Sequence, residues 1–219
     1  MPPTADPATV KGLPESALTP EQLAALPTEI PPAPWDCRAW AMMWVQRGPT
    51  PAFDWLGRPT GLTLAGFVQY LDTPVGTYHE VLAGSLVRTG LTPRLQVPFM
   101  AVDSVPSVAG GRVNWALPKT LASFETDLEA ASARAEGDGW SITVEPVRAG
   151  RAPRRIPIRS RFSSIGPLGA YLTRMRATGR LVRVRTRVEG GSLSGWLGSG
   201  THVALVLNGR MQIDEPRPI

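Results

Sequence analysis

The chain has 219 residues, of which 42% are hydrophobic and 19% charged, and its formal net charge is +5. This composition is that of a globular domain and excludes an intrinsically disordered chain. No apolar run approaches the ~18–20 residues that a membrane-spanning helix requires, and the single cysteine, Cys37, excludes an intrachain disulfide and a cysteine-based zinc site. Because the N-terminus also lacks the basic start and apolar core of a secretory signal, we expect a cytoplasmic protein with no membrane partner.

Residues 1–34 are predicted to form a proline-rich N-terminal arm that precedes one folded domain, residues 35–219. The arm holds nine prolines and shows no sustained hydrophobic periodicity. Thr19, followed by Pro20, has the pattern of a helix N-cap and first turn, which predicts one short helix over residues 20–26. The rest of the arm is expected to be extended.

Segments typical of β-strands dominate the predicted domain. The chain's 23 prolines and 22 glycines are spread along it, as in proteins with many short strands joined by tight turns. Residues 128–135 and 168–178 have short helical patterns, and residues 103–111 are rich in turn formers. The pattern favours a mainly β or α+β domain, built as a sandwich or a closed barrel. The predicted strands cover residues 38–46, 63–71, 78–89, 94–102, 141–147, 180–188 and 202–207.

Several common catalytic and metal sites are excluded by composition. His79 and His202 are the only histidines, so we expect no metal site built from histidine and cysteine. The sequence has no GxGxxG turn between a strand and a helix, no phosphate-binding P-loop and no GxSxG nucleophile turn. Cys37 is expected to be a buried apolar residue rather than the partner of His79 in a thiol–imidazole pair.

Lys119 is the main candidate for chemistry. It and Lys11 are the only lysines, and arginine supplies the other 21 of the 23 basic residues. The two glycines at 110–111 leave the backbone room for a tight turn or for a close approach. Residues 115–118 (WALP) then place Lys119 behind an apolar run that ends in a backbone-restraining proline. This arrangement is suited to holding one amine in an apolar setting.

Two segments of the chain resemble the acetoacetate decarboxylase-like superfamily. They are residues 75–80 (VGTYHE) and residues 110–119 (GGRVNWALPK). The resemblance covers roughly residues 35–219 in the order of elements and is specific across these two segments. It implies a twisted, mostly antiparallel β structure, wrapped into a cone-like barrel with a few short helices, and a homo-oligomer. The predicted strands agree with such a fold.

In that family the lysine after the proline attacks a ketone carbonyl and forms an imine, which accepts the electrons left when a carboxylate departs as CO2. The resemblance therefore implies that Lys119 is the nucleophile of a lyase acting on a small β-keto acid or a related carbonyl compound. No metal or organic cofactor is required, because the imine is itself the electron sink. An attacking amine must be neutral, so the pKa of Lys119 would have to fall from ~10.4 to ~7, which is roughly 4–5 kcal/mol of selective destabilisation of the ammonium form.

The resemblance also assigns roles around the lysine. Glu80 matches a pocket acid that positions substrate or handles protons near the imine. Arg38, in the first strand, is the provisional anchor for a substrate carboxylate, and Arg47 is a weaker candidate. The decarboxylases carry a second lysine directly after the nucleophile, where this chain has Thr120. Burial or an arginine is then left to perturb the pKa of Lys119.

Tyr78, Arg112 and Trp115 complete the predicted substrate-binding set. Each has a structural alternative: the two aromatic residues as members of the core, and Arg112 as a donor to backbone carbonyls of its turn. On a regular strand, His79 points to the side opposite Tyr78 and Glu80. His79 is therefore left out of the predicted site.

Three other functions stay open. The same imine serves aldol or dehydration chemistry, and the same fold without turnover would bind a small carboxylate or keto acid. Residues 148–187 hold twelve arginines, which raises nucleic-acid binding as the main non-enzymatic alternative. Sparse aromatic residues and the lack of a known binding motif argue against a specific nucleic-acid partner. Exposed positions on a half-buried strand account for Arg183, Arg185 and Arg187 without any partner.

Overall fold

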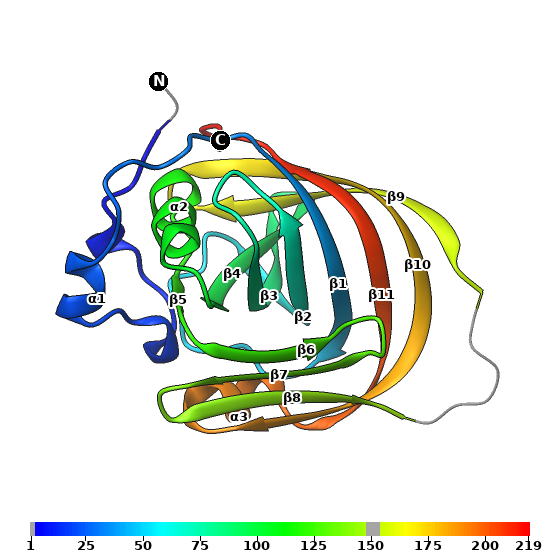
Figure 1. Cartoon of the computed structure of the whole chain (residues 1–219). Coiled ribbons are helices and arrows are strands. Elements are labelled where there is room, and N and C mark those ends of the chain that lie inside the picture. The colour runs from blue at the N-terminus through cyan, green and yellow to red at the C-terminus, as the bar shows by residue number, and fades with distance from the viewer. Residues whose placement is uncertain (1–2, 148–153) are drawn as a thin grey trace.

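The computed structural model describes residues 3–147 and 154–219. Within these ranges the strands join into one 11-stranded sheet and the helices are short (Figure 1). The strands are β1 (Trp35–Arg47), β2 (Arg58–Asp72), β3 (Tyr78–Thr89), β4 (Thr92–Val102), β5 (Lys119–Leu121), β6 (Ser123–Asp127), β7 (Ser132–Gly137), β8 (Trp140–Pro146), β9 (Ile156–Gly166), β10 (Gly169–Glu189) and β11 (Gly200–Ile213). The helices are η1 (Pro7–Thr9), η2 (Pro14–Ser16), α1 (Pro20–Ala24), α2 (Val105–Trp115) and α3 (Gly191–Leu197).

Seven of these strands close into a ring. Hydrogen bonding runs in the order β11-β1-β2-β3-β4-β9-β10, and β10 pairs back onto β11 (Figure 1). Neighbouring ring strands are antiparallel except β4 and β9, and β5 lies off the ring, parallel to β4. The 21-residue strand β10 pairs with β9 along its first half and with β8 along its second. The strands β6, β7 and β8 therefore extend from the ring as a second layer, and the predicted, mostly antiparallel β fold with few short helices is confirmed.

The two faces of the ring strands bury two different apolar clusters. Successive side chains of a strand point to opposite faces, so Trp35 and Ala41 of β1 face the ring interior, whereas Met42 and Trp44 face outward. Residues of β6, β7, β8 and α3 complete the outward cluster, and Figure 1 shows these four elements lying together beside the ring. The closed ring encloses the inward cluster, and α2 and the N-terminal arm add residues to it, among them Val108 and Trp115.

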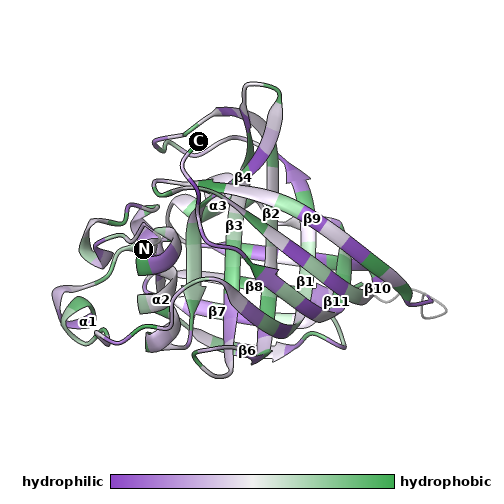
Figure 2. Ribbon diagram, turned by 90° about the horizontal axis from the view of Figure 1, so that it is seen from above, coloured by the Kyte–Doolittle hydropathy of each residue, from purple (hydrophilic) through white to green (hydrophobic). Residues whose placement is uncertain are grey.

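Exposed arginines follow the same alternation on β10. Arg183, Arg185 and Arg187 are exposed while Val184 and Val188 are buried, which confirms the predicted exposed positions. Figure 2 shows the resulting hydrophilic and hydrophobic bands along β10 and β11. Two further arginines of the basic stretch, at 148 and 151, lie outside the described residues.

Three segments differ from their predicted secondary structure. The alanine-rich residues 128–135 form a turn and the start of β7, because Ala133 and Ala135 are buried at strand spacing in the outward cluster. Of the segment 168–178, all residues after the first belong to β10, which begins at Gly169, since pairing with β9 and β11 outweighs their local helical pattern. The predicted turn at 103–111 is mostly α2. Strands β5, β6, β7 and β9 were not predicted, whereas each predicted strand lies within a longer observed one or overlaps it.

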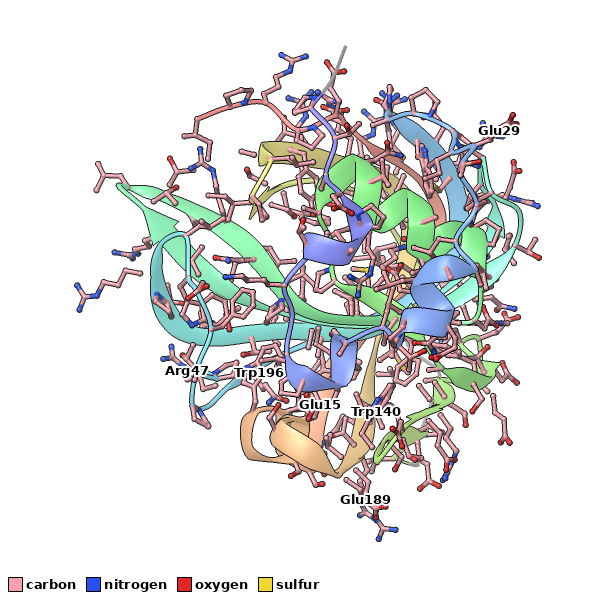
Figure 3. All side chains as sticks on the ribbon, turned by 90° about the vertical axis from the view of Figure 1, so that its left-hand side faces the viewer. Glu15, Glu29, Arg47, Trp140, Glu189 and Trp196 are labelled. Carbon is pink, nitrogen blue, oxygen red and sulfur yellow. The ribbon has the colours of Figure 1, made fainter. Side chains whose placement is uncertain are left out.

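The N-terminal arm packs against the ring at the end occupied by α2. Its helix α1 is confirmed at Pro20–Ala24, where Thr19 accepts a hydrogen bond from the backbone N–H of Gln22. Glu15 accepts a hydrogen bond from the Ser192 hydroxyl of α3 at 2.8 Å, and Figure 3 shows the arm passing over α2 with Glu15 beside α3. The boundary at residue 34 stays a prediction, although β1 does begin at the next residue. None of the helices in the described ranges combines the length and the apolar character needed to cross a bilayer.

Candidate functional site

The end of α2 places Lys119 inside the ring. Ser104 caps the start of this helix by accepting a hydrogen bond from the backbone N–H of Ser107. At the other end Ala116 adopts a left-handed conformation (φ 51°), and the N–H of Leu117 bonds back to the Gly111 carbonyl. The chain then turns into β5, which lies parallel to β4 with Lys119 beside Met100 in the register.

Both glycines of α2 serve a close approach, not a tight turn. A Cβ atom on Gly111 would lie 2.5 Å from Cδ and 2.7 Å from Cε of Lys119. A Cβ atom on Gly110 would lie 2.4 Å from the ring of Trp35. The helix backbone therefore forms one wall of the channel that holds the lysine stem, and a larger residue at 111 would displace it.

The Lys119 ammonium forms a buried ion pair with Glu80. Its Nζ atom lies 2.7 Å from Oε2 of Glu80, and the two side chains are 5% and 3% exposed. Nζ also donates to the Ser107 hydroxyl at 3.0 Å, and the Tyr70 hydroxyl donates to Oε1 of Glu80 at 3.4 Å. The Tyr78 ring lies under the ammonium, with its centroid 5.1 Å from Nζ. The pair is thus held by hydrogen bonds from two sides.

The Glu80 carboxylate reverses the expected effect of burial on the lysine. Burial, the largest single influence, lowers the pKa of Lys119, but the attraction of Glu80, its hydrogen bond and the smaller effect of Tyr78 together outweigh burial and raise the pKa above its ordinary value. The fall of the Lys119 pKa toward ~7 that the sequence led us to expect is therefore wrong in direction. Desolvation alone would lower this pKa, but the sequence did not reveal that an anion lies beside the ammonium. Burial also raises the pKa of Tyr78 and Tyr171 to about 12, so both phenols are neutral near pH 7.

The ion pair lies in the wall of a largely apolar cavity inside the ring. The cavity has a volume of about 260 Å³. Within residues 3–147 and 154–219, Lys119 and Glu80 are the only charged side chains that line it. Its polar lining is otherwise made of hydroxyl groups. The aromatic and hydroxyl-bearing lining residues include Tyr70, Tyr78, Trp115, Ser160, Ser164 and Tyr171.

Four of the six predicted site residues meet at this cavity: Lys119, Glu80, Tyr78 and Trp115. Tyr78 and Trp115 are also members of the inward apolar cluster, so their predicted structural and binding roles are compatible. The Trp115 indole N–H donates to the Asp214 carbonyl at 2.8 Å, which holds the ring in place.

Arg112 does not line the cavity. Its buried guanidinium donates to the carbonyls of Lys119 (2.8 Å), Pro7 (2.9 Å) and Ser16 (2.8 Å), and burial lowers the pKa of Arg112 to about 10. This geometry matches the structural alternative, in which the arginine bonds to backbone carbonyls. Arg112 ties the N-terminal arm to the strand that carries the lysine.

Arg38 lies on the opposite face of β1 from the cavity. Its neighbours in sequence, Cys37 and Ala39, face the ring interior, so the strand alternation turns Arg38 outward. It lines a separate surface groove of about 650 Å³. At this groove Arg38 of β1 lies opposite Arg210 of β11 in the strand register, and Arg210 lies opposite Arg176 of β10. The provisional carboxylate anchor is therefore not brought to the lysine.

Two residues of the site were missed by sequence reasoning, Ser107 and Tyr70. A helix signal was present, because a serine cap at 104 followed by a proline in the first turn is typical of a helix start. With that helix recognised, Ser107 and Gly111 fall four residues apart on one face. Tyr70 had no comparable signal, since only the pairing of β2 with β3 sets it opposite Tyr78.

Thr120 and His79, which adjoin Lys119 and Glu80 in sequence, contact other parts of the structure. Thr120, at the position of the decarboxylases' second lysine, donates to the Ala17 carbonyl of the arm at 3.2 Å. His79 points away from the cavity as predicted: its Nδ1 lies 2.7 Å from Asp103, and its ring stacks on Phe124. Neither side chain reaches the ammonium.

The fold is similar to solved structures of acetoacetate decarboxylase and related enzymes. The acetoacetate decarboxylase from Legionella pneumophila is 14% identical over 97% of this chain and 96% of that chain, with a TM-score of 0.55. An acetoacetate decarboxylase-like enzyme from Sphingomonas wittichii RW1 is 14% identical over 87% and 94%, with a TM-score of 0.54. The enduracididine biosynthesis enzyme MppR, complexed with pyruvate, is 14% identical over 92% and 94%, with a TM-score of 0.53. No family model and no curated protein matches the sequence.

Proposed function

Since the chain has the fold of acetoacetate decarboxylase and its relatives, we propose that it is an imine-forming lyase acting on a small β-keto acid or a related carbonyl compound. Lys119 is the nucleophile, and Glu80 accepts and returns protons. The observation that carries this proposal is the 2.7 Å contact between the Lys119 ammonium and the Glu80 carboxylate in the wall of an apolar cavity. The imine serves as the electron sink, so the reaction uses no other cofactor.

The lysine becomes nucleophilic by passing a proton to Glu80. The transfer converts a buried ion pair into a neutral amine and a neutral carboxylic acid. The raised pKa of Lys119 makes the ion pair the resting form, and the low dielectric of the cavity lowers the cost of leaving it, because the transfer removes both buried charges. The Lys119 amine then attacks the carbonyl carbon and forms a carbinolamine. Glu80 returns its proton to the departing hydroxyl, water leaves, and a protonated imine remains beside the carboxylate. The 2.7 Å separation is within the reach that such proton transfer requires.

The protonated imine then accepts an electron pair from the bond that breaks. With a β-keto acid, the carboxylate leaves as CO2 and its bonding electrons form an enamine. Protonation of the enamine carbon and hydrolysis of the imine release the product and free Lys119. Ser107 and Tyr70 are positioning residues, because their hydroxyls hold the ammonium and the carboxylate in line.

Reductive trapping tests the proposal directly. Incubation with acetoacetate or pyruvate and borohydride is expected to add mass to the peptide that contains Lys119. The chain offers a matched control, because Lys11 is the only other lysine: Lys11→Ala should keep the adduct and Lys119→Ala should lose it. Glu80→Gln keeps the amine but should slow trapping by about 10²-fold or more, the usual contribution of a general acid–base group. No adduct on Lys119 with any of several keto acids and ketones would refute the proposal.

A binding protein without turnover is the second candidate. The raised pKa of Lys119 favours it, because a lysine that keeps its proton can donate a hydrogen bond to a ligand oxygen without attacking the ligand. In that case small carbonyl or carboxylate ligands raise the melting temperature and leave no covalent adduct after reduction.

A further inference from the structure

Among residues 3–147 and 154–219, no cation other than Lys119 lines the cavity, and this restricts the ligands that it accepts. Lys119 and Glu80 are the only charged side chains among the described lining residues, and each neutralises the other. From this balance we infer that the preferred substrate is an uncharged carbonyl compound with an apolar body, rather than a keto acid. This inference rests on the proposed function, because Lys119 is the group that meets the carbonyl.

The other titratable groups around the pair do not change the balance. Burial raises the pKa of Cys37, Tyr78 and Tyr171 to about 12, and it raises the pKa of Tyr70 above its ordinary value. All four side chains are therefore neutral between about pH 6 and pH 9. The charges at the cavity then sum to zero over this range.

The nearest arginines cannot supply the absent cation. The Arg112 guanidinium is bound to four backbone carbonyls, three of them in the N-terminal arm. Arg38 lies in the surface groove on the outer face of β1. A substrate carboxylate in the cavity would therefore meet only Lys119, which Glu80 already neutralises.

An uncharged carbonyl substrate keeps the charge balance through the whole sequence of steps. The ammonium is replaced by a protonated imine, so one positive charge remains, and Glu80 is again a carboxylate once water has left. A keto acid adds one negative charge on entry. Loss of CO2 removes the carboxylate but also neutralises the iminium, so the excess charge stays until a proton arrives from solution. Burial of an unpaired anion is strongly unfavourable, which favours aldol-type cleavage or dehydration over decarboxylation.

A hydroxyl in the wall offers a place for an uncharged oxygen of the ligand. The Ser160 Oγ atom is buried and has no hydrogen-bond partner among the described residues, and Ser160 lines the cavity. Buried hydroxyls are normally paired. A hydroxyl or second carbonyl group in the substrate would satisfy it without adding charge.

The test compares two ligands of the same shape that differ in charge. Levulinate and methyl isoamyl ketone have the same ketone and spacer, and an isopropyl group replaces the carboxylate. Each is titrated near pH 7.5, with calorimetry for binding and cyanoborohydride trapping with mass analysis for the adduct on Lys119. The ketone is expected to bind and to half-saturate trapping at a concentration at least tenfold lower than levulinate. Equal or tighter binding of levulinate, or no binding of the ketone, would overturn the inference.

Two variants show whether charge causes the difference. Glu80→Gln removes the carboxylate that repels a second anion, and a bound levulinate can then return a proton to the Lys119 amine and pair with it. The preference for the ketone in binding should therefore shrink at least tenfold, whereas Arg38→Gln should leave it unchanged. A levulinate affinity that falls in Arg38→Gln would identify that arginine as a carboxylate anchor and contradict the inference. Trapping separates the two claims: binding without an adduct on Lys119 refutes the proposed function, while an adduct that favours levulinate refutes only the choice of substrate.

Discussion

Replacing Glu80 by glutamine should reverse the sign of the pH dependence that Lys119 imposes on stability. In the native chain the folded-state pKa of Lys119 is raised above its ordinary value by Glu80. The ammonium is then present in both the folded and the unfolded state below the unfolded pKa of ~10.4, and its stabilising contribution is lost only as the pH rises through the higher folded pKa. In Glu80→Gln the anion is gone, and burial, the largest influence on this pKa, is opposed only by Tyr78, so the folded pKa should fall below the unfolded one.

The size of the change follows from the number of protons. Where the folded variant holds a neutral amine and the unfolded chain an ammonium, unfolding takes up one proton. The free energy of unfolding then rises by about 1.4 kcal/mol per pH unit. From about pH 7.5 to about pH 9.5 the variant should therefore gain up to about 2.7 kcal/mol relative to the native chain. The variant is least stable at the low end of this range, where the folded state must expel the proton.

Urea unfolding at several pH values measures this difference. Subtracting the native curve removes the contribution of every group that the substitution leaves alone. The double variant Glu80→Gln, Lys119→Met is the control, because it lacks the titrating amine and should lose the slope. A single variant whose stability runs parallel to that of the native protein would show that the ammonium is hydrated in the folded state, and it would refute the reasoning.

Two further substitutions test how the lysine is held. Gly111→Ala should slow trapping on Lys119 at least tenfold in a folded protein. The new Cβ would lie 2.5 Å from the lysine Cδ, and small displacements of a reacting group are costly. An unchanged trapping rate in a variant whose circular dichroism spectrum shows that it is folded would contradict this. Arg112→Met should lower the free energy of unfolding by about 3 kcal/mol or more, because it leaves several buried carbonyls without donors. It should also expose the arm to limited proteolysis. A variant that is as stable and as resistant to proteolysis as the native chain would show that the arm is held by other contacts.

Part of this protein could be predicted from local sequence. Alternating apolar residues indicate strands wherever a strand buries one face, and the exposed arginines of β10 follow from the same period. The two motif segments, residues 75–80 and 110–119, pointed to Glu80 and Lys119, which the structure places 2.7 Å apart. The glycines before the lysine indicated a close approach as one of two possibilities, and the helix packed on the lysine stem realises it.

Closure of the ring decided the rest. Which face of a strand is interior depends on its partners around the whole sheet, so the sequence of β1 did not reveal that Arg38 faces outward. The chain at 168–178 became a strand because neighbours on both sides offered backbone hydrogen bonds, which local propensity does not register. The direction of the pKa shift of Lys119 depended on a carboxylate 39 residues away in sequence. Local pattern specifies which side chains alternate, whereas only the folded sheet specifies which charges meet, because electrostatic energy depends on distance in space.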